Sequence, residues 1–596
     1  MRKGILGNFI LLFRYNLGTL ILFELFHKGI ALILVVPIIK YILESAMHNS
    51  GIIYLSTDNI FKILSNPISI VLLILLLLTL GFYVFFEFTS TIICFDKSIR
   101  YEKIGIFKLI RLGLQKSLKI LYLRNYLLMI FILLIIPLTN LTLTSGFIGE
   151  LKLPDYILDY IKSSNILNLL YIGLMIILYM LVIRWIFSIH EITLNRSSFK
   201  EAKNESNRIT KGKTIKIFLY SIGTFIVFSV VGYGIYYLIV ILTALWTKYY
   251  GVGNDLSEIF IRKAILFKDY SIFIASVSSF ILNLAFISAI YYNYKDITFY
   301  KNRQKKFKLS IIKKITTIIV ILILVPVEAM AFSIHSNTLL NIEFFYNTTA
   351  TAHRGGSIAA PENTLSSFKE AILAQAEYIE TDVQETKDGE LILLHDSNFK
   401  RTTGVDKNVW EVDYEEVKSY DAGSYFNSDY LGEKIPTLDE AIKYVRGRCK
   451  LLIEIKLNGN ESSDVIEKVI KVIKENRVEN QCVIASMNKE VLKKVKEIDP
   501  SFLTCYLTAL AYGNFYTWDY VDIYGIESIF VTKGLISDIH NKGKQIFVWT
   551  VNDQDTMSKM IDLNVDSIIT DDPFLVNDTI YLKKNDFIKI IADYLF

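Results

Sequence analysis

The pattern of apolar and polar positions divides the chain into two unlike parts. Before about residue 335, long apolar runs are separated by short polar segments, whereas after residue 349 the apolar runs have the length of strands and alternate with amphipathic stretches. Roughly 20 apolar residues in a helix cross a bilayer core of about 30 Å. We therefore expect a membrane domain at residues 1–335, a linker at 336–348 and a second domain at 349–596.

Seven membrane spans are predicted in the first part. Six follow directly from apolar runs, and the first is placed after residue 28 because charged side chains interrupt the stretch before it. We expect that earlier stretch to be a helix on the membrane surface. The predicted spans are residues 29–47, 63–86, 125–149, 163–183, 217–247, 270–294 and 315–327, the last extending to about residue 334.

Three ionisable residues, Glu24, His27 and Lys28, fall on one face of the helix that precedes the first span. Such residues mark a polar site when they lie inside a membrane. They are equally explained by an interfacial location in which long side chains reach for water. The sequence leaves both interpretations open.

The basic residues predict the orientation, because Lys and Arg accumulate in cytoplasmic loops. Alternate loops hold eight basic residues at 97–124, seven at 196–216 and eight at 295–314, and the intervening loops are poorer in them. This places the N-terminus in the cytoplasm and, after seven spans, the second domain outside. The basic loops would also suit binding to anionic lipid.

Composition agrees with a membrane protein. The hydrophobic fraction of 52% and the mean hydropathy of +0.39 exceed the values of most soluble proteins. A net charge of +5 over 596 residues gives no indication of nucleic-acid binding. The four cysteines have no metal-ligand spacing such as CxxC, which favours small buried residues over a metal site or a disulfide framework.

The second domain predicts a parallel sheet, since strands alternate with helices such as 364–375, opened by an Asn363 cap, and 465–475. Its size favours a (β/α)8 TIM barrel over an open doubly wound sheet. Nine candidate strands are one more than eight, and we expect 526–531 to be irregular or short. The candidates are 349–353, 378–384, 391–395, 450–456, 482–486, 503–507, 526–531, 545–551 and 567–570.

Acidic residues near two strand ends indicate a metal site. Glu380 and Asp382 are two apart on one strand and share a face, and Glu454 arrives on another strand. The carboxyl ends of barrel strands converge on one mouth. A single such pair is more often a solvated strand end or a salt bridge, but three carboxylates without thiols suit Ca²⁺ or Mg²⁺.

Two histidines close neighbouring strands beside these carboxylates. Alone, His353 or His395 would more often be a core or capping residue. Together with the cations Arg354 and Lys456 they form a general base and a general acid around an anion. Gly355 and Gly356 allow close backbone approach there, and Trp549 is equally suited to filling the barrel or to lining a substrate pocket.

These motifs carry a resemblance to a known family. The segments AHRGG, APENTLSSF, YIETDVQETKDGELILLHDSNFKRTTG, IPTLDEAI, LLIEIK, VWTVND and TDDP, in this order over about residues 351–573, resemble the glycerophosphodiester phosphodiesterase family, in its bacterial type with a fused membrane domain. The resemblance implies a TIM barrel with an insertion at about 397–449 that helps to shape the pocket. One departure is Met487, where the family usually has an aromatic residue.

The resemblance also implies an activity: the hydrolysis of glycerophosphodiesters to glycerol 3-phosphate and an alcohol, with a divalent ion. It implies roles for seven residues: metal ligation by Glu380, Asp382 and Glu454, acid and base roles for His353 and His395, and phosphate contacts by Arg354 and Lys456.

Three hypotheses therefore remain. The leading one is a membrane-anchored hydrolase acting outside the cytoplasm on glycerophosphodiesters or glycerol-phosphate polymers. The second is a lipid hydrolase with lysophospholipase D or phospholipase C activity. The third is a phosphodiester-binding sensor or transporter. The sequence does not distinguish Ca²⁺ from Mg²⁺, name the first-acting histidine or give an oligomeric state.

Overall fold

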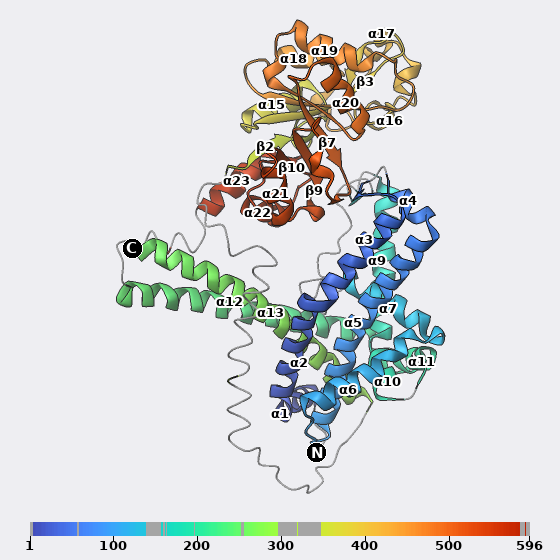
Figure 1. Cartoon of the computed structure of the whole chain (residues 1–596), viewed down its shortest axis with the longest axis vertical. Helices are drawn as coiled ribbons and strands as arrows, with labels where there is room; N and C mark the ends of the chain where they lie inside the picture. Colours follow the sequence, from blue (N-terminus) through green and yellow to red (C-terminus); the bar gives the residue numbers. More distant parts are fainter. Residues whose placement is uncertain are drawn as a thin grey trace.

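The computed structural model describes residues 4–56, 59–138, 157–158, 161, 164–195, 197–251, 256–295, 319, 347–584 and 591. The helices before residue 296 form one body, and the strands and helices from residue 347 onward form a second body above it in Figure 1. This division confirms the expected fold class.

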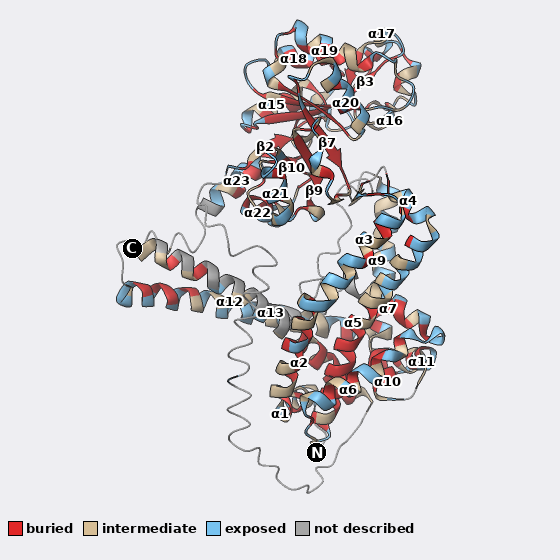
Figure 2. Cartoon of the chain, viewed as in Figure 1, coloured by how far each residue is buried: buried red, intermediate tan, exposed pale blue. Residues whose placement is uncertain are grey.

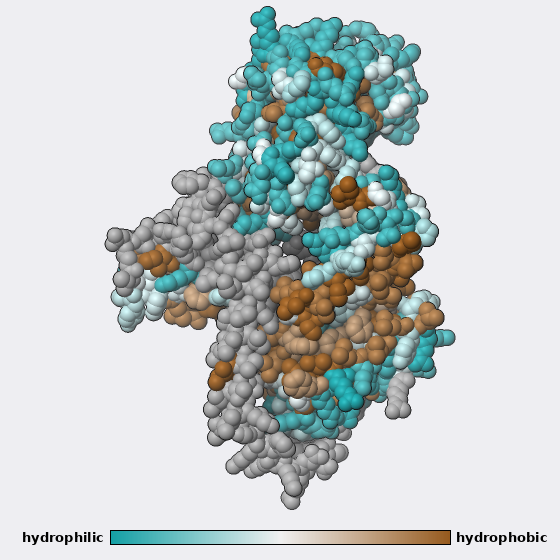
Figure 3. Space-filling model, viewed as in Figure 1, coloured by the Kyte–Doolittle hydropathy of each residue, from teal (hydrophilic) through white to brown (hydrophobic). Residues whose placement is uncertain are grey.

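Long apolar helices build the first body, and Figure 3 shows their apolar side chains as a broad brown area below the barrel. Within the described residues, four predicted spans coincide with helices that are long and apolar enough to cross a membrane. A fifth crossing is available if a bent pair, which meets at 86°, forms one span. The four long helices are Leu17–Asn49, Pro67–Ile99, Asn165–Leu194 and Thr214–Tyr250, and the bent pair is Ile106–Leu121 with Leu123–Leu134.

Of the remaining three predicted spans, two fall partly or almost wholly outside the described residues and one lies in a described helix. Span 125–149 begins in α7 (Tyr126–Leu138), and residues 139–150 are not described. Span 270–294 lies within α13 (Leu256–Tyr294), of which Phe280–Tyr294 is a short apolar helix. The seventh span, 315–327 with its extension, and the linker 336–348 lie outside the described residues, apart from single positions.

The other helices of this body are shorter or flank the long ones. They are α1 (Ile5–Arg14), α4 (Ile60–Ser65) and α11 (Phe199–Thr210). Of the long elements, Asn165–Leu194 consists of α9 (Asn165–Trp185) and α10 (Ser188–Leu194), Thr214–Tyr250 is α12, and the bent pair begins with α6 (Ile106–Ser117).

The first long helix corrects one prediction. The helix α2 (Leu17–Ile30) continues through a π-helical turn (Ala31–Val35) into α3 (Val36–Asn49), so no separate surface helix precedes the span. Glu24, His27 and Lys28 are buried rather than interfacial. The interpretation that they reach for water is wrong, because they contact polar side chains of a second helix.

That second helix is α5 (Pro67–Ile99), which starts where the side chain of Asn66 accepts hydrogen bonds from Ile68 N and Ser69 N. Pro67 occupies the first turn, where its missing N–H costs nothing. The helix runs on to Ile99 rather than ending at residue 86, because its polar second half is buried against the neighbouring helices (Figure 2).

Eight parallel strands form the second body. They close into a barrel, since the last strand pairs with the first and the first pairs with the second. In sheet order they are β2 (Thr349–Ala352), β3 (Tyr378–Glu385), β5 (Lys450–Ile455), β6 (Cys482–Ser486), β7 (Leu503–Thr508), β9 (Ile523–Glu527), β10 (Gln545–Trp549) and β11 (Ser567–Thr570).

The extra ninth strand is not the one that we expected. The strand β4 (Leu391–Leu393) runs antiparallel to the far end of β3 and stands outside the barrel. Of the region predicted as irregular, 526–531, only the first two residues belong to a strand, the end of the parallel strand β9, and Ser528–Phe530 form a 3-10 helix. The prediction failed because a short apolar run looks the same in a hairpin as in a parallel sheet.

Helices cover the barrel, and one predicted cap is wrong. The helix α15 (Leu365–Leu373) is capped by Thr364, whose hydroxyl accepts from Ser367 N, and not by Asn363. The other helices are α18 (Leu438–Val445), α19 (Val465–Glu475), α20 (Lys489–Ile498), α21 (Lys533–His540), α22 (Gln554–Asp562) and α23 (Pro573–Lys584), with short helices α16 (Lys400–Thr403) and α17 (Tyr414–Val417) in the insertion.

A small antiparallel sheet joins the two bodies. The strand β1 (Tyr54–Leu55), in the loop after the first long helix, pairs with β8 (Tyr512–Gly513), in the loop after β7. The ring of Tyr54 packs edge-on against Trp518, 5.1 Å between centroids, and Lys489 Nζ donates to its hydroxyl at 3.2 Å. The barrel is therefore attached at the end of the helices opposite to the N-terminus (Figure 1).

Candidate active site

A cavity of about 740 Å³ opens at the carboxyl ends of the barrel strands. Seven of the eight residues predicted for the site line it. The eighth, Asp382, contacts the lining residue Lys456, with 3.0 Å between Asp382 Oδ1 and Lys456 Nζ. The lining residues used below are His353, Arg354, Glu362, Glu380, His395, Asp396, Arg401, Glu454, Lys456, Met487, Leu507, Trp549, Ile569 and Asp571. The residues predicted from the sequence therefore do lie together at one cavity.

The three predicted carboxylates converge. Asp382 on β3 stands directly opposite Glu454 on β5, and Glu380 precedes Asp382 by two residues on the same face. One oxygen from each lies within 4.8 Å of the others, and all three side chains are buried, at 3%, 1% and 7% exposed in the order Glu380, Asp382 and Glu454. Such a set of hard oxygen donors fits Ca²⁺ or Mg²⁺.

The protonation of these carboxyl groups is uneven. Burial and the neighbouring charge of Asp382 raise the pKa of Glu380 to about 8. Burial also acts on Asp382, but the charges of Lys456 and Arg354, with that of His395 when it is protonated, outweigh it and hold the pKa of Asp382 below its ordinary value. Three buried carboxylates thus repel one another, and a divalent cation among them would relieve that repulsion.

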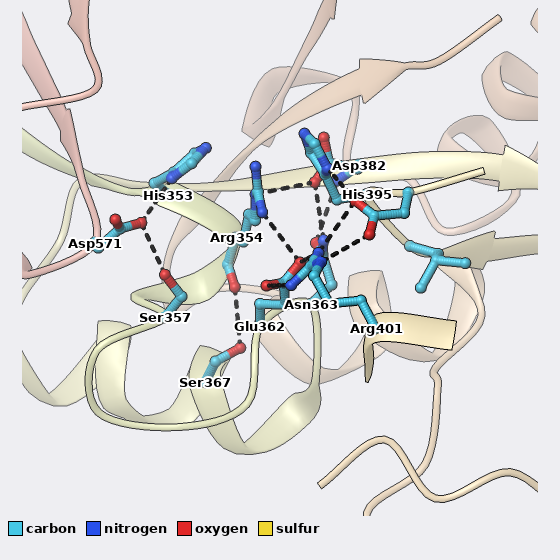
Figure 4. Close-up of polar contacts among 12 residues, drawn as sticks. His353, Arg354, Ser357, Glu362, Asn363, Ser367, Asp382, His395, Arg401 and Asp571 are labelled. Carbon is cyan, nitrogen blue, oxygen red and sulfur yellow. Dashed lines mark hydrogen bonds and ion pairs between the residues drawn. The ribbon is translucent and has the colours of Figure 1, made fainter. Parts of the chain in front are cut away.

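Lys456 and Arg354 stand beside the carboxylates. Lys456 Nζ lies 3.0 Å from Asp382 Oδ1 and 3.0 Å from Glu454 Oε2. Arg354 Nη1 donates to Glu362 Oε1 at 3.2 Å, and its Nε lies 3.8 Å from Asp382 Oδ2 (Figure 4). The two cations therefore flank the carboxylate cluster.

A left-handed turn brings Arg354 into this position. Arg354 has φ +51°, Gly355 and Gly356 follow at +88° and +89°, and the N–H of Arg354 donates to Glu380 Oε2 at 2.8 Å. A Cβ added to Gly355 would lie 2.2 Å from Ser367 Oγ. Glycine is required there both for its conformation and for space, as the sequence indicated.

His353 is held by a carboxylate. Its Nδ1 lies 2.7 Å from Asp571 Oδ1, and the same carboxyl group accepts from Ser357 Oγ at 2.8 Å and from the Asn552 amide at 2.6 Å (Figure 4). Burial disfavours the imidazolium, but the charge of Asp571 outweighs burial and raises the pKa of His353. Because Nδ1 faces Asp571, Nε2 is the nitrogen left for a substrate.

His395 also has a carboxylate partner, but its pKa is shifted in the opposite direction to that of His353. Its Nδ1 lies 2.8 Å from Asp396 Oδ1, and Arg401 Nε donates to Asp396 Oδ2 at 2.7 Å. Burial is the largest influence and lowers the pKa of His395, despite the attraction of Asp382. The loop after β4 is fixed by the Gln384 amide, which donates to the carbonyls of Leu394 and Asp396 at 2.8 and 2.7 Å.

Comparison with known proteins gives the site a context. Residues 7–327 match the membrane domain of glycerophosphoryl diester phosphodiesterase, and residues 353–575 match the glycerophosphoryl diester phosphodiesterase family. The chain belongs to the glycerophosphodiester phosphodiesterase family. It is thus an enzyme, a phosphoric diester hydrolase of glycerophosphodiesters, with a membrane domain.

Relatives cover the catalytic part of the chain. A glycerophosphodiester phosphodiesterase of Caldanaerobacter subterraneus is 37% identical over 232 residues, which are 38% of this chain and 95% of that protein. One from Bacillus altitudinis is 31% identical over 240 residues, 38% of this chain and 95% of that protein. A solved Oleispira antarctica phosphodiesterase, in complex with the product sn-glycerol-3-phosphate, is 27% identical and covers 39% of this chain and 96% of that one, with a TM-score of 0.37.

Three polar residues of this phosphodiesterase site, Asp571, Asn363 and Glu362, had not been assigned to it from the sequence. Asp571 lies in the motif TDDP and holds His353, and Asn363 lies in APEN and donates to Asp382 Oδ2 at 2.9 Å. Glu362, also in APEN, binds Arg401 Nη1 at 2.6 Å. The sequence shows the motifs that contain these residues. It does not show which residues they contact, because those contacts form only when the barrel closes.

The other side of the phosphodiesterase cavity is apolar. Trp549, at the end of β10, and Met487 pack on the barrel core that includes Leu507 and Ile569, and all four line the cavity. Trp549 therefore both fills the barrel and forms a wall. Ile157, from the membrane domain, also lines this cavity.

Proposed function

We propose that this chain hydrolyses glycerophosphodiesters to glycerol 3-phosphate and an alcohol outside the cytoplasm, with a divalent ion and two histidines. The observation that carries the proposal is the convergence of Glu380, Asp382 and Glu454 between two histidines with opposite pKa shifts. Environments that shift the pKa values of two titratable groups in opposite directions are typical of acid and base pairs. Either Ca²⁺ or Mg²⁺ fits the oxygen donors.

The cations would bind the phosphodiester. A divalent ion held by Glu380, Asp382 and Glu454 supplies positive charge against the phosphoryl oxygens. Arg354 and Lys456 line the cavity beside it and would contact the same anion, where their charges stabilise the negative charge that grows in the transition state. Trp549 would form the wall of the pocket next to the substrate.

The two histidines would move the protons. His395, whose pKa is lowered, is neutral near pH 7 and takes the proton of the attacking hydroxyl, from water or from the glycerol moiety of the substrate. His353, whose pKa is raised, keeps its proton and gives it to the oxygen of the leaving alcohol. Asp571 and Asp396 orient the rings through Nδ1, so Nε2 acts in both.

This assignment predicts a bell-shaped pH profile of kcat/KM around 6.5, the ordinary pKa of histidine. Activity rises as His395 loses its proton below that pH and falls as His353 loses its proton above it. In Asp571→Asn the charge that raises the pKa of His353 is gone, so we expect the alkaline limb to move down by about 1 to 3 pH units. The profile of initial rates against pH measures this shift.

A matched variant separates the two limbs. Asp396→Asn removes the partner of His395, whose pKa then falls further, so only the acid limb should move to lower pH. If Asp571→Asn moved the acid limb, the acid and base roles would be exchanged.

We also propose an N-terminal membrane domain at 1–335, a linker at 336–348 and a catalytic domain at 349–596 that lies outside the cytoplasm. Two observations support this location. The described start of the first basic loop contacts the N-terminal segment, where Asn16 bonds to Glu102 and Ile104, and the barrel pairs through β8 with the loop that follows the first long helix, at the other end.

The location predicts a labelling pattern. The four native cysteines are buried, so single added cysteines report on their own positions. A membrane-impermeant maleimide should label Lys471→Cys, on the barrel, in intact cells, and should label Arg208→Cys, in a basic loop, only after permeabilisation; these two side chains are 73% and 74% exposed. The reverse pattern would refute the orientation.

The activity itself is tested with purified full-length protein. Incubation with glycerophosphocholine and Ca²⁺ or Mg²⁺ should release glycerol 3-phosphate, and a chelator should stop the release. The apolar wall of Met487, Leu507 and Ile569, joined by Ile157, favours one second candidate, a lysolipid substrate. Turnover of lysolipid without turnover of glycerophosphocholine would favour that candidate, and release that persists in chelator would overturn metal dependence.

A further inference from the structure

Four ionisable side chains meet inside the membrane domain, far from the catalytic barrel. Glu24, His27 and Lys28 of α2 face Glu87 of α5, and each of the four is at most 1% exposed. Charged groups within membrane helices are costly and rarely serve packing alone. This cluster therefore requires a physical account that anchoring does not supply.

The contacts within the cluster are unequal. Lys28 Nζ donates to Glu87 Oε1 at 2.5 Å, but lies 4.0 Å from Glu24 Oε2, beyond hydrogen-bond distance. Glu24 Oε1 accepts from the Thr91 hydroxyl at 3.1 Å. Glu24 Oε2 is fully buried and has no hydrogen-bond partner among the described residues. An ionised oxygen in that position would lack both water and a donor.

His27 does not supply the missing charge. Its ring stacks on Tyr83 at 4.1 Å, with Nε2 placed 3.3 Å from the Tyr83 carbonyl and Nδ1 3.1 Å from the Tyr83 hydroxyl. Because a carbonyl only accepts, Nε2 carries a proton, and Nδ1 can accept from the hydroxyl. A neutral ring satisfies both contacts, and Glu87 Oε1 is farther away, at 3.6 Å.

The charges of the cluster then leave one negative charge without a partner. Two carboxylates, Glu24 and Glu87, stand against one ammonium, Lys28. The other groups that face Glu24 and its neighbours are Tyr83, Thr91 and Cys94 of α5 and the Phe280 ring of α13, 5.8 Å from Lys28 Nζ. None of these is a cation.

We propose that Glu24 is a proton-binding site of the membrane domain. A proton on its carboxyl group neutralises the cluster, lets Lys28 pair with Glu87 alone and removes the charge from the oxygen that has no donor. The geometry described above is that of the protonated state. Loss of the proton would place Lys28 between two carboxylates and would change the contact of α2 with α5.

A metal ion fits this place less well than a proton. Ligand atoms of Glu24, His27 and Glu87 lie within 4.8 Å of one another, close enough to surround an ion. However, the Lys28 ammonium already donates a hydrogen bond to Glu87 Oε1. It would repel a second cation in a site without water. Both nitrogens of His27 are also engaged by Tyr83.

Infrared spectroscopy of the full-length protein in lipid nanodiscs tests the proposal. A buried protonated carboxyl group has a C=O stretching band that is separate from carboxylate bands. At neutral pH, with Mg²⁺ present to keep the catalytic carboxylates ionised, we expect one such band per chain, and we expect Glu24→Gln to lose it. Glu44→Gln, an exposed glutamate on α3 with 53% exposure, is the matched control and should retain it.

Further variants keep the test decisive. Glutamine mimics a protonated glutamate, so Glu24→Gln should fold and should hydrolyse glycerophosphocholine at the unchanged rate, which separates this test from the catalytic proposal. Lys28→Met removes the ammonium and should shift the loss of the band to higher pH. A wild-type spectrum without the band, a band that persists in Glu24→Gln, or a band that appears only when Na⁺ is withdrawn would each overturn the proposal.

Discussion

Replacing Glu380 by glutamine is expected to lower kcat/KM for glycerophosphocholine by about 1,000-fold. The oxygens of Glu380, Asp382 and Glu454 lie within 4.8 Å of one another, and a neutral amide removes one of three charges that would hold a divalent ion. A bound ion contributes several kcal/mol of charge stabilisation, and about 4 kcal/mol corresponds to this factor. Rates at saturating Mg²⁺ or Ca²⁺ and metal binding by calorimetry measure the loss.

Two further variants define the cause of this loss. Glu454→Gln, on a different strand, should behave like Glu380→Gln, because the ion would bridge the strands β3 and β5. Glu377→Gln is the control: this glutamate precedes β3 at the opposite end of the barrel, is 44% exposed and pairs with Lys450 at 2.7 Å. If Glu380→Gln bound the ion normally and kept its activity, the proposed ligand set would be wrong.

The barrel was predictable from the sequence because its signal is local and repeated. Strand-length apolar runs alternate with amphipathic helices, and each run can be predicted as a strand without knowing which strand it pairs with. Pairing is where the prediction failed. The strand β4 was counted as a barrel strand, yet it folds back on β3 as an antiparallel hairpin. A three-residue run such as Leu391–Leu393 carries no sign of its partner.

The same limit applies to the candidate site. Residues at strand ends, such as Glu380 and Glu454, could be predicted because the barrel geometry brings all strand ends together. His395 was predicted for the wrong reason, since it follows the hairpin strand and reaches the cavity through the Gln384 contacts. Asp571 was not assigned, because its pairing with His353 joins the last strand to the first, 218 positions apart.

The membrane domain shows how burial changes the interpretation of a charge. From the sequence, Glu24 and Lys28 were compatible with an interfacial helix, since their apolar neighbours on α2 do not reveal what lies opposite. Glu87, the residue that receives them, lies 59 positions beyond Lys28 and had been placed at the end of a span. Only the packing of α5 on α2 reveals the cluster.

Replacing either histidine by glutamine is expected to lower the rate by about 100- to 10,000-fold, the usual contribution of a positioned acid or base. An activated substrate separates the two roles. With the glycerophosphate ester of para-nitrophenol, the leaving group needs no proton, so His353→Gln should regain most of the wild-type rate, whereas His395→Gln should remain impaired, because its task is to remove a proton from the nucleophile.

The control for both histidine variants is His540→Gln, since His540 lies on α21, is 36% exposed and pairs with Asp566 away from the cavity. Its rate should equal that of the wild type on both substrates. If the activated substrate rescued His395→Gln instead, His395 would be the acid and His353 the base. The raised pKa of His353 beside Asp571 argues against that exchange, since a raised pKa lowers the fraction of neutral imidazole that can accept a proton.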